Sequence, residues 1–333
     1  TRSYGSSIES IIDHACSNVT TFQRNGIAAC AKHWPGEGYD DRDQHLVTTI
    51  NPLSLEDWHA RYGRIYREMI ESGVMTIMSA HIAFPAYARA HGADTREACR
   101  PACVSRLLNE QLLRQELGFN GLIVSDATGM AGFGAWDKRE RMVPELIASG
   151  CDMLLFPNDM EADLGFLHAA LADGRLSEAR VTEAATRVLG LKASLGLHRQ
   201  DATQRSPDAA HAQAILRQPS HLEVSRKLAS ASVTLVKDVH QILPLSPERT
   251  RRIVVVTDPT RRGFVGAPPV PLSLPERLRA SGFEVRDYDA SQLPSADNAD
   301  LVLYLLAQES ILGQHWVGID WSALHGGFPF NMH

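Results

Sequence analysis

Four side chains with acid, base or nucleophilic character follow short apolar segments in the first 130 residues. Lys32 and His33 end the small apolar run 28–31, and His81 and Asp126 each close a later apolar run. A carboxylate at the end of a buried strand is costly unless it is paired or used in chemistry, so Asp126 is the sharpest candidate for a reacting group. The alternatives are that Asp126 caps the following loop and that His81 is a hydrogen-bonded core histidine.

A second candidate is the pair Asp43 and His45, which lies in the polar loop after the first apolar run. An aspartate two residues from a histidine can accept its ring proton, fix its tautomer and stabilise the imidazolium, as the acid does in a hydrolase triad. Because the charged run 40–42 precedes the pair, a solvated loop is the alternative. The nearby Gly36-x-Gly38 lacks the third glycine and the helix of a dinucleotide-binding fingerprint.

Composition excludes several classes of function. The chain has 333 residues and a net charge of −6, and its Lys and Arg residues are spread along the sequence, which argues against a nucleic-acid or membrane-surface role. No apolar stretch approaches the roughly 18 residues of a membrane span. Cys99 and Cys103 have loose metal-ligand spacing without a second pair in register, so we expect no metal site and no cofactor. Scattered cysteines favour reduced thiols in a cytoplasmic protein.

The elements that must position these residues alternate between strand and helix. Strands are expected at 27–33, 74–80, 121–125 and 151–156, and helices at 6–25, 55–72, 104–117, 138–149, 160–173 and 178–195. Such alternation predicts an α/β fold with parallel strands joined by right-handed crossovers. Polar residues at the carboxyl ends of the strands are typical of the catalytic face of a (β/α) barrel, although a closed barrel needs eight strands.

A second region follows a polar stretch. Residues 200–220 predict a linker after a first domain at 1–199. Residues 221–333 predict an open α/β sandwich, with helices near 221–230 and 274–281 and strands near 232–237, 252–257, 283–288 and 300–306.

Together these residues resemble glycoside hydrolase family 3, and within it the β-N-acetylhexosaminidase branch. Arg2-Ser-Tyr resembles the family's Arg-Ser-(Phe/Tyr) segment, and Lys32-His-Trp-Pro-Gly with Gly38 resembles its Lys-His-(Phe/Trp)-Pro-Gly-x-Gly signature. Asp43-Gln-His resembles the Asp-Ser-His of the branch with a histidine acid/base. Residues 118–126, with Met130, resemble the nucleophile strand. The combination is specific, although each motif alone is modest.

The resemblance implies that 1–199 form the C-terminal half of a (β/α)8 TIM barrel and that 221–333 begin an incomplete α/β sandwich domain. It also implies retaining hydrolysis of a terminal β-linked N-acetylhexosamine, from an oligosaccharide or a muropeptide ending in N-acetylglucosamine. Asp126 would be the nucleophile, and His45, oriented by Asp43, would be the acid/base. The remaining matched residues, Arg2, Lys32 and His33, would hydrogen-bond sugar hydroxyls.

Two departures and three alternatives follow from the same comparison. Ala127 and Thr128 replace an Asp and a Leu that are usual after the nucleophile. Without the first barrel half the pocket would be incomplete, so we expect weak or no activity from this chain alone. A β-glucosidase or β-xylosidase would take its acid/base from a Glu in the second domain. An N-acetylglucosaminide phosphorylase would use the neutral imidazole to admit phosphate, and a sugar-binding relative would not turn over. The oligomeric state is not indicated.

Overall fold

The computed structural model describes residues 3–201, 208–257, 273–289, 291, 294–295 and 297–305. Two compact units are distinguished, Thr1–Ser206 and Pro207–His333. The division falls inside the stretch 200–220 for which we expected a linker, and helix α10 (Ala209–Ile215) occupies part of that stretch.

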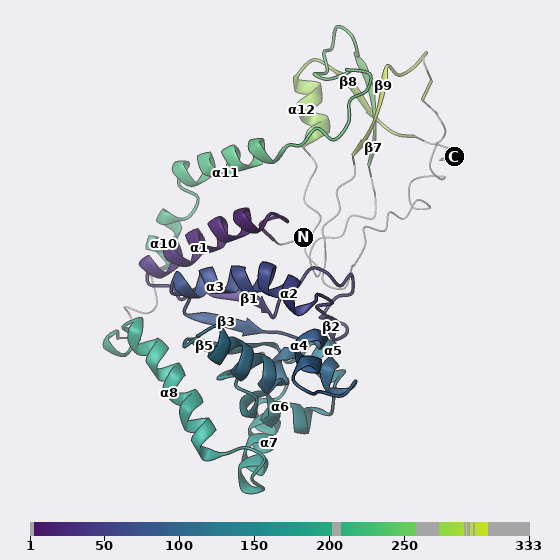
Figure 1. The fold of residues 1–333 in the computed structure, drawn as a ribbon. Coiled ribbons are helices and arrows are strands. Elements are labelled where there is room, and N and C mark those ends of the chain that lie inside the picture. Colours follow the sequence, from purple (N-terminus) through teal and green to yellow (C-terminus); the bar gives the residue numbers. More distant parts are fainter. Residues whose placement is uncertain are drawn as a thin grey trace. The chain divides into compact units, whose positions relative to one another are not determined.

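The first unit alternates helices with short strands (Figure 1). Its strands are β1 (Cys30–Trp34), β2 (Thr49–Ile50), β3 (Thr76–Ser79), β4 (Ile82–Ala83), β5 (Leu122–Ala127) and β6 (Met153–Leu155). Its α-helices are α1 (Ile8–Arg24), α2 (Leu55–Trp58), α3 (Arg64–Glu71), α4 (Pro85–Ala90), α5 (Ala131–Gly134), α6 (Arg139–Ala148), α7 (Met160–Ala172) and α8 (Glu178–Ser194). Shorter or differently wound helical segments are η1 (His59–Gly63), η2 (Glu97–Cys99), η3 (Ala102–Val104), η4 (Leu107–Glu116) and η5 (Leu197–Arg199).

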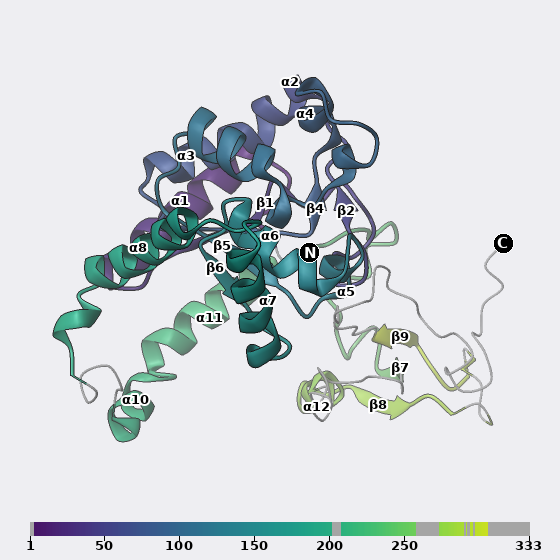
Figure 2. The same cartoon turned by 90° about the horizontal axis from the view of Figure 1, so that it is seen from below.

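The predicted α/β class is confirmed by a four-stranded parallel sheet in the order β1-β3-β5-β6. Ile77 of β3 pairs with Ile123 of β5, and Val124 of β5 pairs with Met153 of β6. Helix α1 packs against α3, and α6 packs against α7 (Figures 1 and 2). Because all four strands run in one direction, the segments that follow β1, β3 and β5 emerge at the same edge of the sheet.

Local signals set the bounds of several helices. The hydroxyl oxygens of Ser7, Ser54 and Ser177 each accept a hydrogen bond from the backbone N–H three residues later. Each bond satisfies one of the donors that a helix start leaves unpaired. Gly73 follows α3 with a φ of 80°, a left-handed conformation that glycine adopts without strain and that ends the helix.

Aromatic packing fixes the carboxyl end of β1. Trp34 is fully buried, and its ring meets those of Trp58 and Tyr66 edge-on at centroid distances of 5.7 and 4.8 Å. Such pairs contribute about 0.5–1.5 kcal/mol each beyond the area that they bury. The indole N–H of Trp58 also donates to the carbonyl oxygen of Pro35 at 2.8 Å. The loop after β1 therefore starts from a rigid base.

A buried charge cluster closes the amino ends of β5 and β6. The side chain of Asp152 is fully buried, and its oxygens accept hydrogen bonds from Arg114 at 2.7 Å and Arg180 at 2.6 Å. The backbone N–H of Ile123 donates to the same carboxylate at 2.9 Å. Buried charges are tolerated when they are paired and hydrogen-bonded in this way.

The second unit contains a three-stranded parallel sheet. Its strands are β7 (Arg252–Thr257), β8 (Glu284–Asp287) and β9 (Leu301–Leu305), in the order β8-β7-β9. Helices α11 (Pro219–Ser232) and α12 (Leu274–Ala280) follow α10 in its described part. The strand that we expected at 232–237 is wrong. Helix α11 continues through Ser232, and the residues after it pair with no strand in the described part of the unit. Val233 and Val236 are 81% and 91% exposed. An apolar run forms a strand only where a neighbouring strand accepts its backbone hydrogen bonds, and this run has no such neighbour in the described part of the unit.

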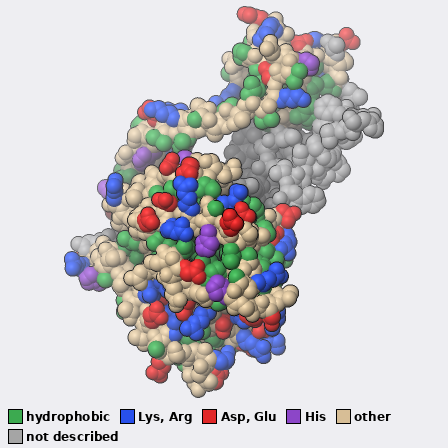
Figure 3. Space-filling model, in the orientation of Figure 1, with side chains coloured by type: hydrophobic (Ala, Val, Ile, Leu, Met, Phe, Trp, Pro, Cys, Tyr) green, Lys and Arg blue, Asp and Glu red, His purple; other side chains and the backbone are tan. Residues whose placement is uncertain are grey.

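The surface carries charges of both signs, as the spread of Lys and Arg along the sequence predicts. On the face drawn in Figure 3, acidic and basic side chains are interspersed over the described residues. Within those same residues, no helix is long and apolar enough to cross a membrane.

Candidate active site

The residues that we singled out gather where β1, β3 and β5 end. Lys32 and His33 belong to the last part of β1, His81 follows β3, and Asp126 is near the end of β5. Arg2, which we also expected at the site, lies outside the described residues.

The two carboxylate oxygens of Asp126 have different surroundings. The residue is 8% exposed, and its Oδ1 accepts a hydrogen bond from the backbone N–H of Ala127 at 2.7 Å. Its Oδ2 lies 3.6 Å from Nε2 of His33. Because that distance exceeds a hydrogen bond, His33 does not occupy a lone pair of Oδ2.

His33 and Lys32 occupy different environments. His33 is largely buried, and its Nδ1 lies 2.7 Å from a carboxylate oxygen of Glu37. Lys32 is exposed. The imidazole therefore faces Asp126, and the contact of Lys32 with a sugar stays a prediction.

Asp43 and His45 form a carboxylate–imidazole pair. Oδ1 of Asp43 lies 2.5 Å from Nδ1 of His45 and also accepts the backbone N–H of His45 at 2.9 Å. An ionised carboxylate only accepts hydrogen bonds, so Nδ1 carries the hydrogen and Nε2 is left for proton transfer. The His45 side chain is 29% exposed, so part of the ring is accessible.

The loop that carries this pair is attached to the loop after Asp126. The backbone N–H of Ala131 donates to the carbonyl oxygen of His45 at 2.9 Å, and the hydroxyl of Thr48 donates to that of Gly132 at 3.1 Å. A Cβ at Gly132 would stand 2.1 Å from the carbonyl oxygen of Gln44, so the two loops approach as closely as glycine permits. The loop that carries His45 is thereby tied to the start of α5, five residues after Asp126.

His81 is a buried histidine with a partner at each ring nitrogen. Its Nε2 lies 3.0 Å from the carbonyl oxygen of Ala127, and its Nδ1 lies 3.3 Å from Sγ of Cys103. Burial lowers the pKa of His81, while the Ala127 carbonyl and the charge of Asp126 oppose that shift. A neutral ring that donates through Nε2 holds the backbone next to Asp126. The contacts of His81 are therefore those of a hydrogen-bonded core histidine, and they also position the end of β5.

Three residues near the pair escaped the sequence reasoning: Glu37, Gln44 and Gly132. Gln44 is 1% exposed, and its side chain bridges a carboxylate oxygen of Glu37 and the backbone N–H of His81. A glutamate four residues after His33 was the only sequence signal, and it carries weight only once the loop conformation is known.

Thr128, one of the two departures noted after Asp126, makes two side-chain hydrogen bonds. Its hydroxyl donates to the carbonyl oxygen of Phe156 at 2.9 Å and accepts from Arg139 at 3.0 Å. Arg139 is itself paired with Asp163, which is 3% exposed. A hydroxyl in place of an apolar side chain therefore ties β5 to the segment after β6.

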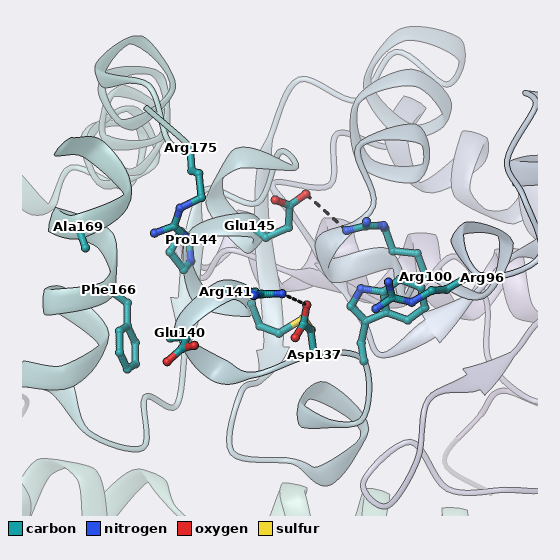
Figure 4. A pocket seen from close by; sticks show the side chains of 12 residues that line it. Arg96, Arg100, Asp137, Glu140, Arg141, Pro144, Glu145, Phe166, Ala169 and Arg175 are labelled. Carbon is teal, nitrogen blue, oxygen red and sulfur yellow. Dashed lines mark ion pairs between the residues drawn. The ribbon is translucent and has the colours of Figure 1, made fainter. Parts of the chain in front are cut away.

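A pocket of about 730 Å³ lies along α6 and is separate from these residues (Figure 4). Trp136 lies beneath the guanidinium groups of Arg96 and Arg100, at 4.9 and 5.2 Å from its ring centroid. Charged side chains that line it form ion pairs, Arg100 with Glu145 and Arg141 with Asp137. No predicted site residue lines this pocket.

The described residues also contain no group of three or more His, Cys, Asp or Glu side chains placed to hold a metal ion. Cys103 is buried beside His81, whereas Cys99 is only half-buried. The chemistry that this arrangement can perform is nucleophilic attack by a carboxylate with proton transfer by an imidazole.

Comparison with known proteins gives this geometry a context. Residues 1–191 match the family model for the "Glycosyl hydrolase family 3 N terminal domain". A "Beta-N-acetylglucosaminidase/beta-glucosidase" of Cellulomonas fimi is 37% identical over 342 aligned residues, which cover 97% of this chain and 59% of that protein. A "Beta-hexosaminidase" of Vibrio cholerae is 31% identical over 162 residues, 48% of this chain and 45% of that protein.

Two solved structures are also similar. "Beta-glucoside phosphorylase BglX bound to 2FGlc" is 33% identical, with a TM-score of 0.88 over 97% of this chain and 59% of that one. A family 3 β-N-acetylglucosaminidase from Paenibacillus sp. is 27% identical, with a TM-score of 0.72 over 86% of this chain and 52% of that one. The alignments with the Cellulomonas protein and with these two structures each cover most of this chain. They cover only 52–59% of the relative's own length.

Proposed function

The chain belongs to glycoside hydrolase family 3, and from that premise we propose that it carries the nucleophile and the acid/base of a retaining β-N-acetylhexosaminidase. The observation that supports this most directly is the junction of two loops. One loop holds the Asp43–His45 pair, the other follows Asp126, and the carbonyl oxygen of His45 is hydrogen-bonded to the N–H of Ala131.

The proposed reaction has two steps. Oδ2 of Asp126 attacks the anomeric carbon, and Nε2 of His45 gives its proton to the glycosidic oxygen as that bond breaks. Asp43 stabilises the imidazolium that is needed at the start of this step. Water then loses a proton to the neutral imidazole and attacks the same carbon, which breaks the ester to Asp126 and releases the sugar.

The proposed substrate ends in β-linked N-acetylglucosamine. The names of the Cellulomonas, Vibrio and Paenibacillus relatives support this sugar, and the first of them supports β-glucosides as a second substrate. In the proposal Lys32 and His33 hydrogen-bond sugar hydroxyls, as does Arg2, and the leaving group is a chitin oligosaccharide or a muropeptide fragment. All five cysteines are free thiols, which supports a cytoplasmic location.

An enclosed sugar pocket needs more strands around it than the described sheet provides. Four strands are half of the eight in a closed barrel, so we propose that further strands complete the pocket. This chain alone should accordingly turn over weakly or not at all, whereas the full-length protein should be active.

Phosphorolysis is a second candidate, because BglX is named a β-glucoside phosphorylase and is 34% identical over 92% of this chain. A neutral imidazole repels phosphate less than a second carboxylate would. In that case phosphate replaces water in the second step.

The test incubates the full-length protein with N,N′-diacetylchitobiose, with and without phosphate, and identifies the products by mass spectrometry. Release of N-acetylglucosamine in both buffers, abolished by Asp126→Asn, supports hydrolysis. A sugar 1-phosphate formed only with phosphate supports the second candidate. Tight sugar binding without any product would contradict both and favour a binding protein.

A further inference from the structure

Glu37, in the loop that follows β1, contacts groups on two sides of the site. Its Oε2 lies 2.7 Å from Nδ1 of His33, and its Oε1 accepts a hydrogen bond from Nε2 of Gln44 at 3.3 Å. Gln44 stands between Asp43 and His45 in the chain. One carboxylate therefore links the imidazole that faces Asp126 to the loop of the acid/base pair.

The side chain of Gln44 and the backbone of Glu37 are both anchored. The buried side chain of Gln44 also accepts the backbone N–H of His81 at 3.3 Å. The carbonyl oxygen of Glu37 accepts the hydroxyl of Tyr62 at 2.6 Å, and the ring of Tyr62 fills the space that Gly36 leaves without a side chain. The Glu37 side chain is 47% exposed, so these contacts rather than burial fix its position.

The contact with Glu37 decides which nitrogen of His33 carries hydrogen. Because an ionised carboxylate only accepts, Nδ1 donates, and Nε2 of the neutral ring is left with a lone pair. Nε2 lies 3.6 Å from Oδ2 of Asp126. In the opposite tautomer an N–H would point at this oxygen, and a hydrogen bond to it would stabilise the carboxylate and weaken it as a nucleophile.

We propose that Glu37 is a positioning residue that holds His33 in the Nδ1–H tautomer. Nε2 is then an acceptor for a sugar hydroxyl beside Asp126, and Oδ2 of Asp126 remains available to the anomeric carbon. The other oxygen, Oδ1, stays on the backbone N–H of Ala127. The inference rests on the proposed function, because it takes Asp126 as the nucleophile.

Glu37→Gln tests this with little change in shape. The introduced amide nitrogen can donate to Nδ1 of His33 while its oxygen accepts from Gln44, so both contacts are retained and the His33 tautomer is reversed. Glu71→Gln is the matched control, since Glu71 ends α3 on the exposed surface and its loss removes the same charge.

Two measurements are made on each variant. Nitrogen NMR spectra of the histidine rings, with His33 assigned through His33→Gln, report the tautomer in this chain directly. The rate at which a 5-fluoro N-acetylglucosaminyl inactivator labels Asp126 is measured in the full-length protein. We expect Nδ1–H in the wild type and Glu71→Gln, Nε2–H in Glu37→Gln, and labelling slowed roughly 10- to 100-fold only in Glu37→Gln.

A wild-type His33 that is protonated at Nε2, in either charge state, would overturn the inference. A reversed tautomer in Glu37→Gln with an unchanged labelling rate would also overturn it. If the wild type takes no label at Asp126, the proposed function fails, and the ring spectra still decide whether Glu37 holds His33.

Discussion

Replacing Gly132 by alanine should disable the acid/base while leaving the nucleophile in place. The added Cβ would stand 2.1 Å from the carbonyl oxygen of Gln44 and 2.8 Å from that of Val47, both backbone atoms. Ordinary contact begins at 3.4 Å, so the loop must retreat by about 1.3 Å. His45 moves with it, because His45 lies between Gln44 and Val47 in that loop, and the retreat breaks the hydrogen bond from the N–H of Ala131 to its carbonyl oxygen.

A misplacement of about 1 Å costs up to ~10²-fold in rate, and the overpacked junction should lower the free energy of unfolding by about 1–3 kcal/mol. The rate effect should depend on the leaving group, because a poor leaving group needs the proton of His45 and a good one does not. The assay is kcat/KM of the full-length protein on aryl N-acetylglucosaminides whose phenols span a wide range of acidity.

Gly134→Ala is the matched control within the same short helix, α5. A Cβ at Gly134 meets nothing within 4 Å, and its φ is outside the left-handed region. Its kinetics should equal the wild type. A folded Gly132→Ala variant that cleaves poor leaving groups at the wild-type rate would refute the role given to the loop junction.

Three further predictions concern acid catalysis, buried charge and pH. His45→Ala should slow cleavage of poor leaving groups by about 10²–10⁴-fold and spare activated ones, and a uniform loss across leaving groups would contradict its role as acid. Asp152→Asn should lower the free energy of unfolding by about 3–5 kcal/mol in urea titrations, because Arg114 and Arg180 lose their buried carboxylate; a loss below 1 kcal/mol would contradict this. Burial lowers the pKa of His81, so the unfolded chain binds this proton more readily and stability should fall as pH drops below about 6.5. His81→Gln, which keeps a donor for Ala127, should flatten that fall in urea titrations from pH 8 to 5, and an unchanged slope would contradict the assignment.

Residues on the strands were predictable because their placement is local. An apolar run that ends in a polar residue predicts both the strand and the position of its carboxyl end. Parallel strands then bring such ends together. This is why His33 and Asp126 could be expected at one edge of the sheet, and why the short spacing of Asp43 and His45 predicted their pairing.

Contacts between loops were not predictable in the same way. The contact of Gln44 with His81 joins residues 37 positions apart, and the approach of Gly132 to Gln44 depends on the path of two irregular segments. Hydrophobic periodicity carries no information about such paths. The strand expected at 232–237 failed for a related reason, since an apolar run does not reveal whether a partner strand is present.

The measurement that tests the central claim most directly is covalent trapping of the nucleophile. The full-length protein is treated with the 5-fluoro N-acetylglucosaminyl inactivator, digested, and mapped by tandem mass spectrometry. The account predicts one sugar adduct, on the peptide that contains Asp126, and none in Asp126→Asn. An adduct on another residue, or a folded protein that binds N-acetylglucosamine and takes no label, would contradict it.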